Sequence, residues 1–98
     1  MEAGYIIKSS KDILAINLKY YRYKLSLSQE KFAEAIDTNL LYEYQLENGK
    51  RNPSLKMLDK ISQNISKILG YTVSSSELIL YDKNKIINAN RIDGRKNK

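Results

Sequence analysis

The sequence predicts an all-α protein in which five short helices pack into one compact domain. The chain has 98 residues, the usual size of a single domain. Apolar residues recur every three or four positions through most of its length, which is the period of an amphipathic helix. Residues that cap helices precede these segments, and the connections between the segments are short. These observations together predict a small helical bundle.

The first two helices are predicted over about residues 10–24 and 29–36. Ser9 or Ser10 can cap the first helix, and Ser28 can cap the second, because serine side chains accept hydrogen bonds from the free N–H groups of a first turn. Apolar residues at helical spacing form the buried stripes, with Ile13, Leu14, Leu18, Tyr21 and Leu25 in the first helix and Phe32, Ala33 and Ile36 in the second.

A tight turn at 37–39 leads into a third helix that is predicted to end at Gly49. Glycine just past the last turn can adopt the left-handed conformation that satisfies the final carbonyl groups. The fourth helix follows Pro53 and keeps its apolar period as far as Gly70. A fifth helix is predicted over about 75–81, where a serine and a glutamate three positions apart have the spacing of a capping box.

Three segments are predicted, namely an N-terminal arm over 1–9, the helical domain over 10–81 and a short basic tail over 82–98. Residues 82–85 have the composition of a turn, and two isoleucines follow at 86–87. A small hairpin, a strand that contacts a second subunit and a loose tail are all compatible with this pattern.

The positive charge is concentrated in this tail. The whole chain has a net charge of +6, and residues 82–98 hold six basic and two acidic side chains. A basic balance favours a nucleic acid or another anionic surface as partner, because neutralised phosphates release their counterions. The alternative for the tail is a solubilising end that contacts no phosphate.

The composition argues against an enzyme. The chain has no Cys and no His, which removes disulfides, thiolate nucleophiles, imidazole bases and nearly all zinc sites. The acidic residues have no metal-ligand pattern, and no glycine-rich loop could hold a phosphate. We therefore expect no enzymatic activity, cofactor, metal or small-molecule substrate.

The sequence also predicts a cytoplasmic protein with no membrane partner. The N-terminus has neither the basic nor the apolar region of an export signal. Every apolar run is far shorter than the about 20 residues that span a bilayer. A nucleic-acid partner, which the positive charge favours, would place the protein at the nucleoid.

The second and third predicted helices, over 28–48, have the spacing of a helix-turn-helix, whose second helix enters the DNA major groove. Ala33 supplies the small residue that is needed where the two helices cross. Together with the segments 27–30 and 46–55, this pattern resembles the phage repressor and Cro-type helix-turn-helix family, also called the xenobiotic-response-element family. The resemblance runs without a gap over 14–58 and implies a repressor-like DNA-binding domain.

The resemblance implies an ion pair between Arg22 on the first helix and Glu47 on the third. Such a pair would lock the DNA-reading helix against the rest of the domain. If the pair is buried, loss of one partner is expected to cost about 3–5 kcal/mol, because the other charge is left unpaired. The alternative is a surface ion pair worth less than about 1 kcal/mol.

The resemblance also implies which side chains contact the DNA phosphates. Gln29 matches the family residue that contacts a phosphate at the start of the second helix, and Ser28 is expected to be a cap first and a phosphate contact second. Lys50, Arg51 and Asn52 follow the third helix, where the family often places phosphate contacts. The alternative for these three residues is a solvated loop.

Base reading falls, by the same resemblance, to five positions on the third helix, namely Asn39, Leu40, Leu41, Tyr44 and Gln45. A glutamine amide can pair with adenine, whereas leucine can only contact the methyl group of thymine. Such a face suits operators rich in A and T. Adjacent exposed leucines are also typical of surfaces that bind other proteins.

Two positions depart from the family pattern. Asp37 stands where the family has a glycine, which is a mild change because aspartate can adopt left-handed backbone angles. Glu43 stands where the family has an aliphatic core residue, and a buried unpaired carboxylate is very unfavourable. We therefore expect either a rotated third helix, with Leu40 or Tyr44 in the core position, or a cationic partner for Glu43.

We predict a transcriptional regulator that binds double-stranded DNA sequence-specifically, and specifically a repressor. It would act as a homodimer on a palindromic operator whose half-sites lie about one helical turn (about 34 Å) apart. The alternative is a protein-interaction module on the same fold, such as an antirepressor or an antitoxin component. That module would bind its partner through the apolar face of the third helix.

Overall fold

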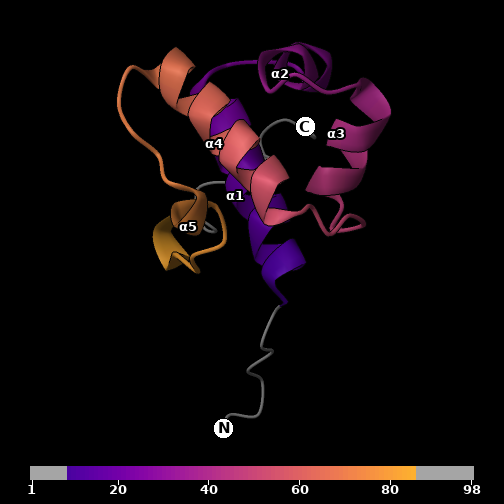
Figure 1. Ribbon diagram of the computed structural model, residues 1–98, viewed down its shortest axis with the longest axis vertical. Coiled ribbons are helices and arrows are strands. Elements are labelled where there is room, and N and C mark those ends of the chain that lie inside the picture. Colours follow the sequence, from indigo (N-terminus) through magenta and orange to yellow (C-terminus); the bar gives the residue numbers. More distant parts are fainter. Residues whose placement is uncertain (1–8, 86–98) are drawn as a thin grey trace, which may run out of the picture.

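The computed structural model describes residues 9–85, and within that range every regular element is a helix. The elements are α1 (Ser10–Lys24), α2 (Gln29–Ala35), α3 (Leu40–Glu47), α4 (Leu55–Leu69) and α5 (Ser75–Leu78). The predicted all-α fold is confirmed, and all five predicted helices are present. In the view of Figure 1, α4 crosses in front of α1, with α2 and α3 at the top and right and α5 at the lower left. The helix α1 contacts α3 and α5, and α4 contacts α2 and α5. No helix in the described range is long and apolar enough to cross a membrane.

The predicted helix limits hold to within a residue or two for the first four helices. The N-cap side chain accepts a hydrogen bond from the backbone N–H three positions later in α2, α3, α4 and α5, where the caps are Ser28, Asn39, Ser54 and Ser74. In α5 the glutamate of the capping box also accepts from the cap's backbone N–H. The cap of α1 is Ser9, whose hydroxyl instead donates to Asp12.

The fifth helix ends at Leu78, three residues earlier than predicted. The cause is Asn17 of α1, which is fully buried and 60 positions away in the sequence. Its amide donates to three backbone carbonyls around the end of α5, those of Glu77, Leu78 and Leu80, at 3.3, 2.8 and 3.0 Å. These carbonyls are therefore satisfied by a side chain and do not continue a helix.

The expected turn at 82–85 is wrong, because residues 83–85 are helical. The Asp82 side chain accepts a hydrogen bond from the backbone N–H of Asn84, as a helix cap does. Lys85 donates to the Tyr21 hydroxyl at 3.0 Å and fastens this segment to α1. The rest of the predicted basic tail, and all but the last residue of the N-terminal arm, lie outside the described residues.

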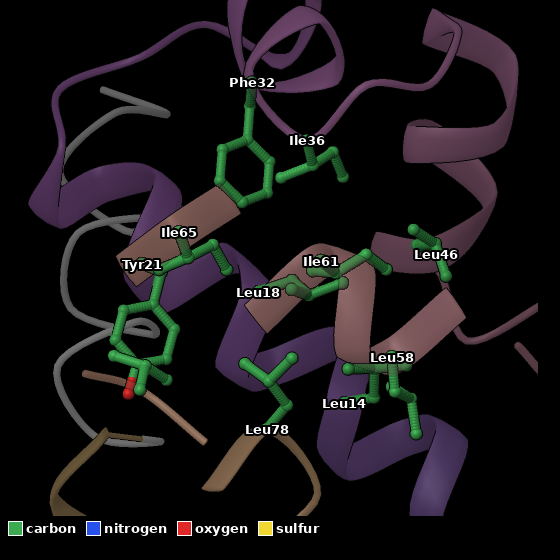
Figure 2. Close-up of a cluster of buried hydrophobic side chains, with 11 residues drawn as sticks. Leu14, Leu18, Tyr21, Phe32, Ile36, Leu46, Leu58, Ile61, Ile65 and Leu78 are labelled. Carbon is green, nitrogen blue, oxygen red and sulfur yellow. The ribbon is translucent and has the colours of Figure 1, made fainter. Parts of the chain in front are cut away.

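The hydrophobic core lies between α1 and α4, and side chains from the other helices close it (Figure 2). The predicted stripes contribute Leu14, Leu18 and Tyr21 from α1, Phe32 and Ile36 from the α2 segment, and Leu58, Ile61 and Ile65 from α4. Leu46 from α3 and Val73 and Leu78 around α5 complete the core. The α2–α3 unit is thus held on a scaffold formed by the two longest helices.

The connection between α2 and α3 uses left-handed backbone at Asp37, with φ +63°. This is the position where the Cro-type pattern has glycine, and aspartate tolerates these angles at modest cost, as expected from the sequence. Lys60 of α4 lies 3.3 Å from the Asp37 carboxylate. Ala33, the small residue expected where the two helices cross, is buried.

Two glycines with left-handed backbone provide a matched test of the α3–α4 loop. Gly49 has φ +69°, and a Cβ atom there would lie 2.8 Å from Asp12 Oδ1, whereas Gly70, with φ +84°, has nothing within 4 Å. Gly70→Ala is expected to lower the free energy of unfolding by about 1–2 kcal/mol through backbone strain alone. Gly49→Ala should lower the free energy of unfolding, measured in urea, by up to about 1 kcal/mol more than Gly70→Ala does. The reason is that the new Cβ atom displaces the Asp12 side chain from its hydrogen bond with Ser9.

The extra cost of Gly49→Ala should disappear when Asp12 is replaced by Ala in both backgrounds. Equal costs for the two single glycine variants would contradict this account of the loop.

Candidate nucleic-acid interface

The helix α3 presents one apolar face to solvent. Leu40, Leu41 and Tyr44 are 48, 63 and 54% exposed, and Gln45 on the same face is half-buried. The opposite face of the helix packs inward through Glu43, Leu46 and Glu47. The helix is therefore not rotated, and the positions that the family resemblance assigns to base reading are the ones that face outward.

Three predicted DNA contacts already have partners within the chain. The Asn39 side chain accepts from the backbone N–H of Tyr42 at 2.8 Å, and Ser28 accepts from that of Lys31 at 3.1 Å. Gln29 donates its amide to Glu47 Oε1 at 3.5 Å, a contact that the sequence did not suggest. Ser28 and Asn39 are thus caps in this structure, and the Gln29 side chain is turned toward the interior.

The loop that follows α3 places Lys50, Arg51 and Asn52 in solvent. Arg51 Nε donates to Gln45 Oε1 at 2.8 Å, and the Arg51 guanidinium carbon lies 4.8 Å from the centre of the Tyr42 ring. The predicted reading residue Gln45 and the predicted phosphate contact Arg51 are therefore joined. The sequence spacing of six positions across a helix end did not indicate this pairing.

Arg22 and Glu47 form a buried, bidentate ion pair between α1 and α3. The distances are 2.6 Å from Arg22 Nε to Glu47 Oε2 and 3.0 Å from Nη2 to Oε1, and the two side chains are 4 and 2% exposed. Arg22 Nη1 also donates to the carbonyl of Leu27 at 3.2 Å. Burial alone would lower the pKa of Arg22, but the hydrogen bonds and charge of Glu47 outweigh it and raise the pKa.

Glu43 is fully buried, and neither expectation for it is correct. Leu40 and Tyr44 remain exposed, so no rotation has replaced Glu43 in the core. No residue of the described range is a cationic partner either, since both carboxylate oxygens are buried without a hydrogen-bond partner there and the Arg22 guanidinium is engaged by Glu47.

The carboxyl of Glu43 avoids an unpaired buried charge by keeping its proton. Burial first, and the neighbouring Glu47 carboxylate second, raise its pKa from the ordinary value of 4.5 to about 9, while the charge of Arg22 opposes the shift. At neutral pH this side chain is a neutral acid in the aliphatic position of the fold. The burial follows from the tertiary packing of α3, which is why the sequence left the outcome open.

The comparisons with known proteins identify relatives for most of the described chain. The family model described as helix-turn-helix matches residues 18–74. The control protein C.MunI of a Mycoplasma species is 44% identical over 59 residues, which span 60% of this chain and 80% of that protein. The crystal structure of a hypothetical transcription factor, NHTF, from Neisseria shares the fold with a TM-score of 0.62 at 20% identity, over 86% of this chain and 93% of that one.

Replacement of Glu43 by a side chain that cannot ionise should change how stability depends on pH. The folded pKa of about 9 lies above the ordinary 4.5, so the native protein loses stability as pH rises between these values, by about 1.4 kcal/mol per pH unit. Glu43→Gln should match the native stability near pH 4 and exceed it by about 3 kcal/mol at pH 7 in urea titrations.

The control for Glu43→Gln is Glu30→Gln, which removes an exposed carboxylate from α2. This control should leave the pH dependence unchanged. Parallel stability curves for Glu43→Gln and the native protein would show that Glu43 does not titrate as described.

Proposed function

The chain belongs to the helix-turn-helix family, and we propose that it is a transcription regulator that binds double-stranded DNA as a homodimer. It would act at the nucleoid, on a palindromic operator, and repress by covering a promoter. The observation that carries the proposal is the placement of α3. Its inner face is fixed by the Arg22–Glu47 pair, and its outer face is open to solvent.

The outer face of α3 suits insertion into the major groove. B-DNA admits an α-helix there, and base edges are read by side chains on the inserted helix. One stripe runs from the cap to the last turn of α3, and its members are the exposed Leu40, Leu41 and Tyr44 and the half-buried Gln45. The leucines would contact thymine methyl groups, and Asn39 would reach a base edge with its free amide N–H groups.

Positive charge next to the outer face supports a phosphate backbone as the partner. Lys50, Arg51 and Asn52 are exposed directly after α3, where they would meet phosphates beside the groove. Ser28 and Gln29 at the start of α2 would contact phosphate on the other side, once the long Gln29 side chain turns outward. The relative C.MunI is named a control protein, which supports a regulatory role for this chain.

A separate apolar surface supports the homodimer. A pocket of about 250 Å³ is lined by Ser10, Lys11, Leu14, Asn52, Pro53, Leu55, Leu58 and Ile79. Leu55 at its rim is 77% exposed, and Leu80, next to Ile79, is 57% exposed. Of the proposed DNA contacts only Asn52 lines this pocket, and none of the outer-face residues of α3 does, so two copies could meet here and leave the outer face of α3 free for DNA in both.

The alternative function is a protein-interaction module, and the exposed pair Leu40 and Leu41 favours it. Adjacent exposed leucines with Tyr44 beside them form an apolar patch that a partner protein could cover. The two functions differ in their response to salt. Binding to phosphates weakens steeply as salt rises, whereas an apolar contact hardly changes.

The DNA-binding proposal predicts selective, salt-dependent binding to the DNA upstream of the protein's own gene. Fluorescence anisotropy at two salt concentrations should show a preference of about 10³-fold or more over a scrambled duplex. The double variant Leu40→Ser/Leu41→Ser should lose much of this preference and keep most of its affinity for the scrambled duplex. Equal, weak binding to both duplexes, or salt-insensitive binding to a protein, would contradict the proposal.

The homodimer proposal predicts that a charge at the pocket rim separates the subunits. The chain mass is 11.4 kDa, and light scattering after size exclusion should give twice that value. Leu55→Asp should give monomers and weaken operator binding. Ile68→Asp, at a 45% exposed position on the same helix outside the pocket, should leave the dimer intact. A monomeric native protein, or a dimeric Leu55→Asp variant, would refute this interface.

A further inference from the structure

We propose that Arg51 reads a guanine base, and that Gln45 and Tyr42 hold its guanidinium in position for that contact. The inference rests on the proposed function, because it assumes that the outer face of α3 meets DNA. It differs from the phosphate role that the family resemblance gives to Arg51 and from the adenine role that it gives to Gln45.

The guanidinium of Arg51 is fixed at two points. Its Nε donates to Gln45 Oε1 at 2.8 Å, and its carbon atom lies 4.8 Å from the centre of the Tyr42 ring. The backbone N–H of Lys50 also donates to the carbonyl of Gln45 at 2.9 Å, so the loop itself is bonded to the last turn of α3. Arg51 therefore lies at the end of the outer face of α3, although it follows the helix in sequence.

The bond to Arg51 determines what Gln45 can offer the groove. An amide recognises adenine by accepting from N6 with its oxygen and donating to N7 with its nitrogen. Here the oxygen already accepts from a charged donor. The reversed amide would place its N–H groups against those of the guanidinium, so chemistry fixes the orientation. Gln45 then acts mainly as a support, with its amide nitrogen as the remaining donor.

The same bond leaves Arg51 with the donors that guanine requires. A guanidinium has five N–H groups, and the bond to Gln45 uses only the one on Nε. The groups on Nη1 and Nη2 are not used by any described residue. A planar fork of N–H donors matches O6 and N7 of guanine, which is the commonest specific contact between a side chain and a base.

The adjacent Lys50 differs from Arg51 because no neighbouring side chain within residues 9–85 holds its charged group in place. Its side chain is exposed and makes no hydrogen bond or ion pair with the described residues. A mobile ammonium group is suited to a phosphate, for which charge alone is enough. A guanidinium held by a hydrogen bond and an aromatic ring has a defined direction, which is what base recognition needs. We therefore infer a G·C pair in each half-site, at the position that faces the last turn of α3.

The test compares base preferences at every operator position for the native protein, Arg51→Lys and Lys50→Gln. The duplexes are variants of the preferred site that differ at one base pair each. Arg51→Lys keeps the charge and loses the fork, so it should lose about 10- to 100-fold discrimination at one G·C pair while the salt dependence stays the same. Lys50→Gln should weaken all duplexes alike and reduce the salt slope by about 1.

A third variant separates the support role of Gln45 from a reading role. Gln45→Ala should weaken the preference at the same G·C pair that Arg51→Lys affects, because the guanidinium has lost its anchor. Loss of a preference for adenine at a different pair would overturn the inference. So would an Arg51→Lys variant that keeps the native profile or weakens every duplex equally.

Failure of the proposed function gives a different result. A native protein with no preference among the duplexes would refute sequence-specific DNA binding itself, and the inference with it. A native protein that discriminates among the duplexes, with base preferences that Arg51→Lys leaves unchanged, would refute only the inference. Because Arg51 and Lys50 are both exposed, circular dichroism of the variants should match that of the native protein.

Discussion

The buried pair of Arg22 and Glu47 is the interaction on which the rest of the structure depends. The helix α3 has eight residues, too few to be stable alone, so its direction is set by the contacts of its inner face. The pair fastens α3 to α1, and the same guanidinium donates to the carbonyl of Leu27 just before α2. Gln29, the first residue of α2, donates to Glu47 as well. Both members of the helix-turn-helix are therefore positioned by one arginine on α1.

Within residues 9–85, that arrangement offers one buried cation, Arg22, for two buried carboxyl groups. Glu47 accepts hydrogen bonds from Nε and Nη2 of Arg22, and Glu43 lies beside Glu47 without a hydrogen-bond partner. If both were ionised, their repulsion and the loss of hydration would far exceed what one arginine can compensate. The proton on Glu43 resolves the conflict, because it leaves Arg22 fully paired with Glu47. The chain thus keeps the position of α3 at some cost in stability near neutral pH.

The sequence predicted what local rules decide, and it failed where distant residues decide. Serine and asparagine caps defined the starts of four helices, because a cap bond involves residues three positions apart. The end of α5 depends on Asn17, some 60 positions away, and no local pattern indicates it. The exposed face of α3 was predicted by the family resemblance. The protonation of Glu43 and the link between Gln45 and Arg51 were not, since both depend on tertiary placement.

The composition of the reading face also bears on the oligomeric state. Two leucines and a tyrosine make most of this face, and they carry few hydrogen-bond donors for base edges. A good bidentate contact contributes about 1–3 kcal/mol of discrimination, whereas specific sites are typically preferred by about 4–10 kcal/mol. A single fork at Arg51, with methyl contacts from the leucines, falls short of that range. Under the proposed function, two half-sites read by two copies would double the discrimination, which is the energetic reason that we propose a dimer.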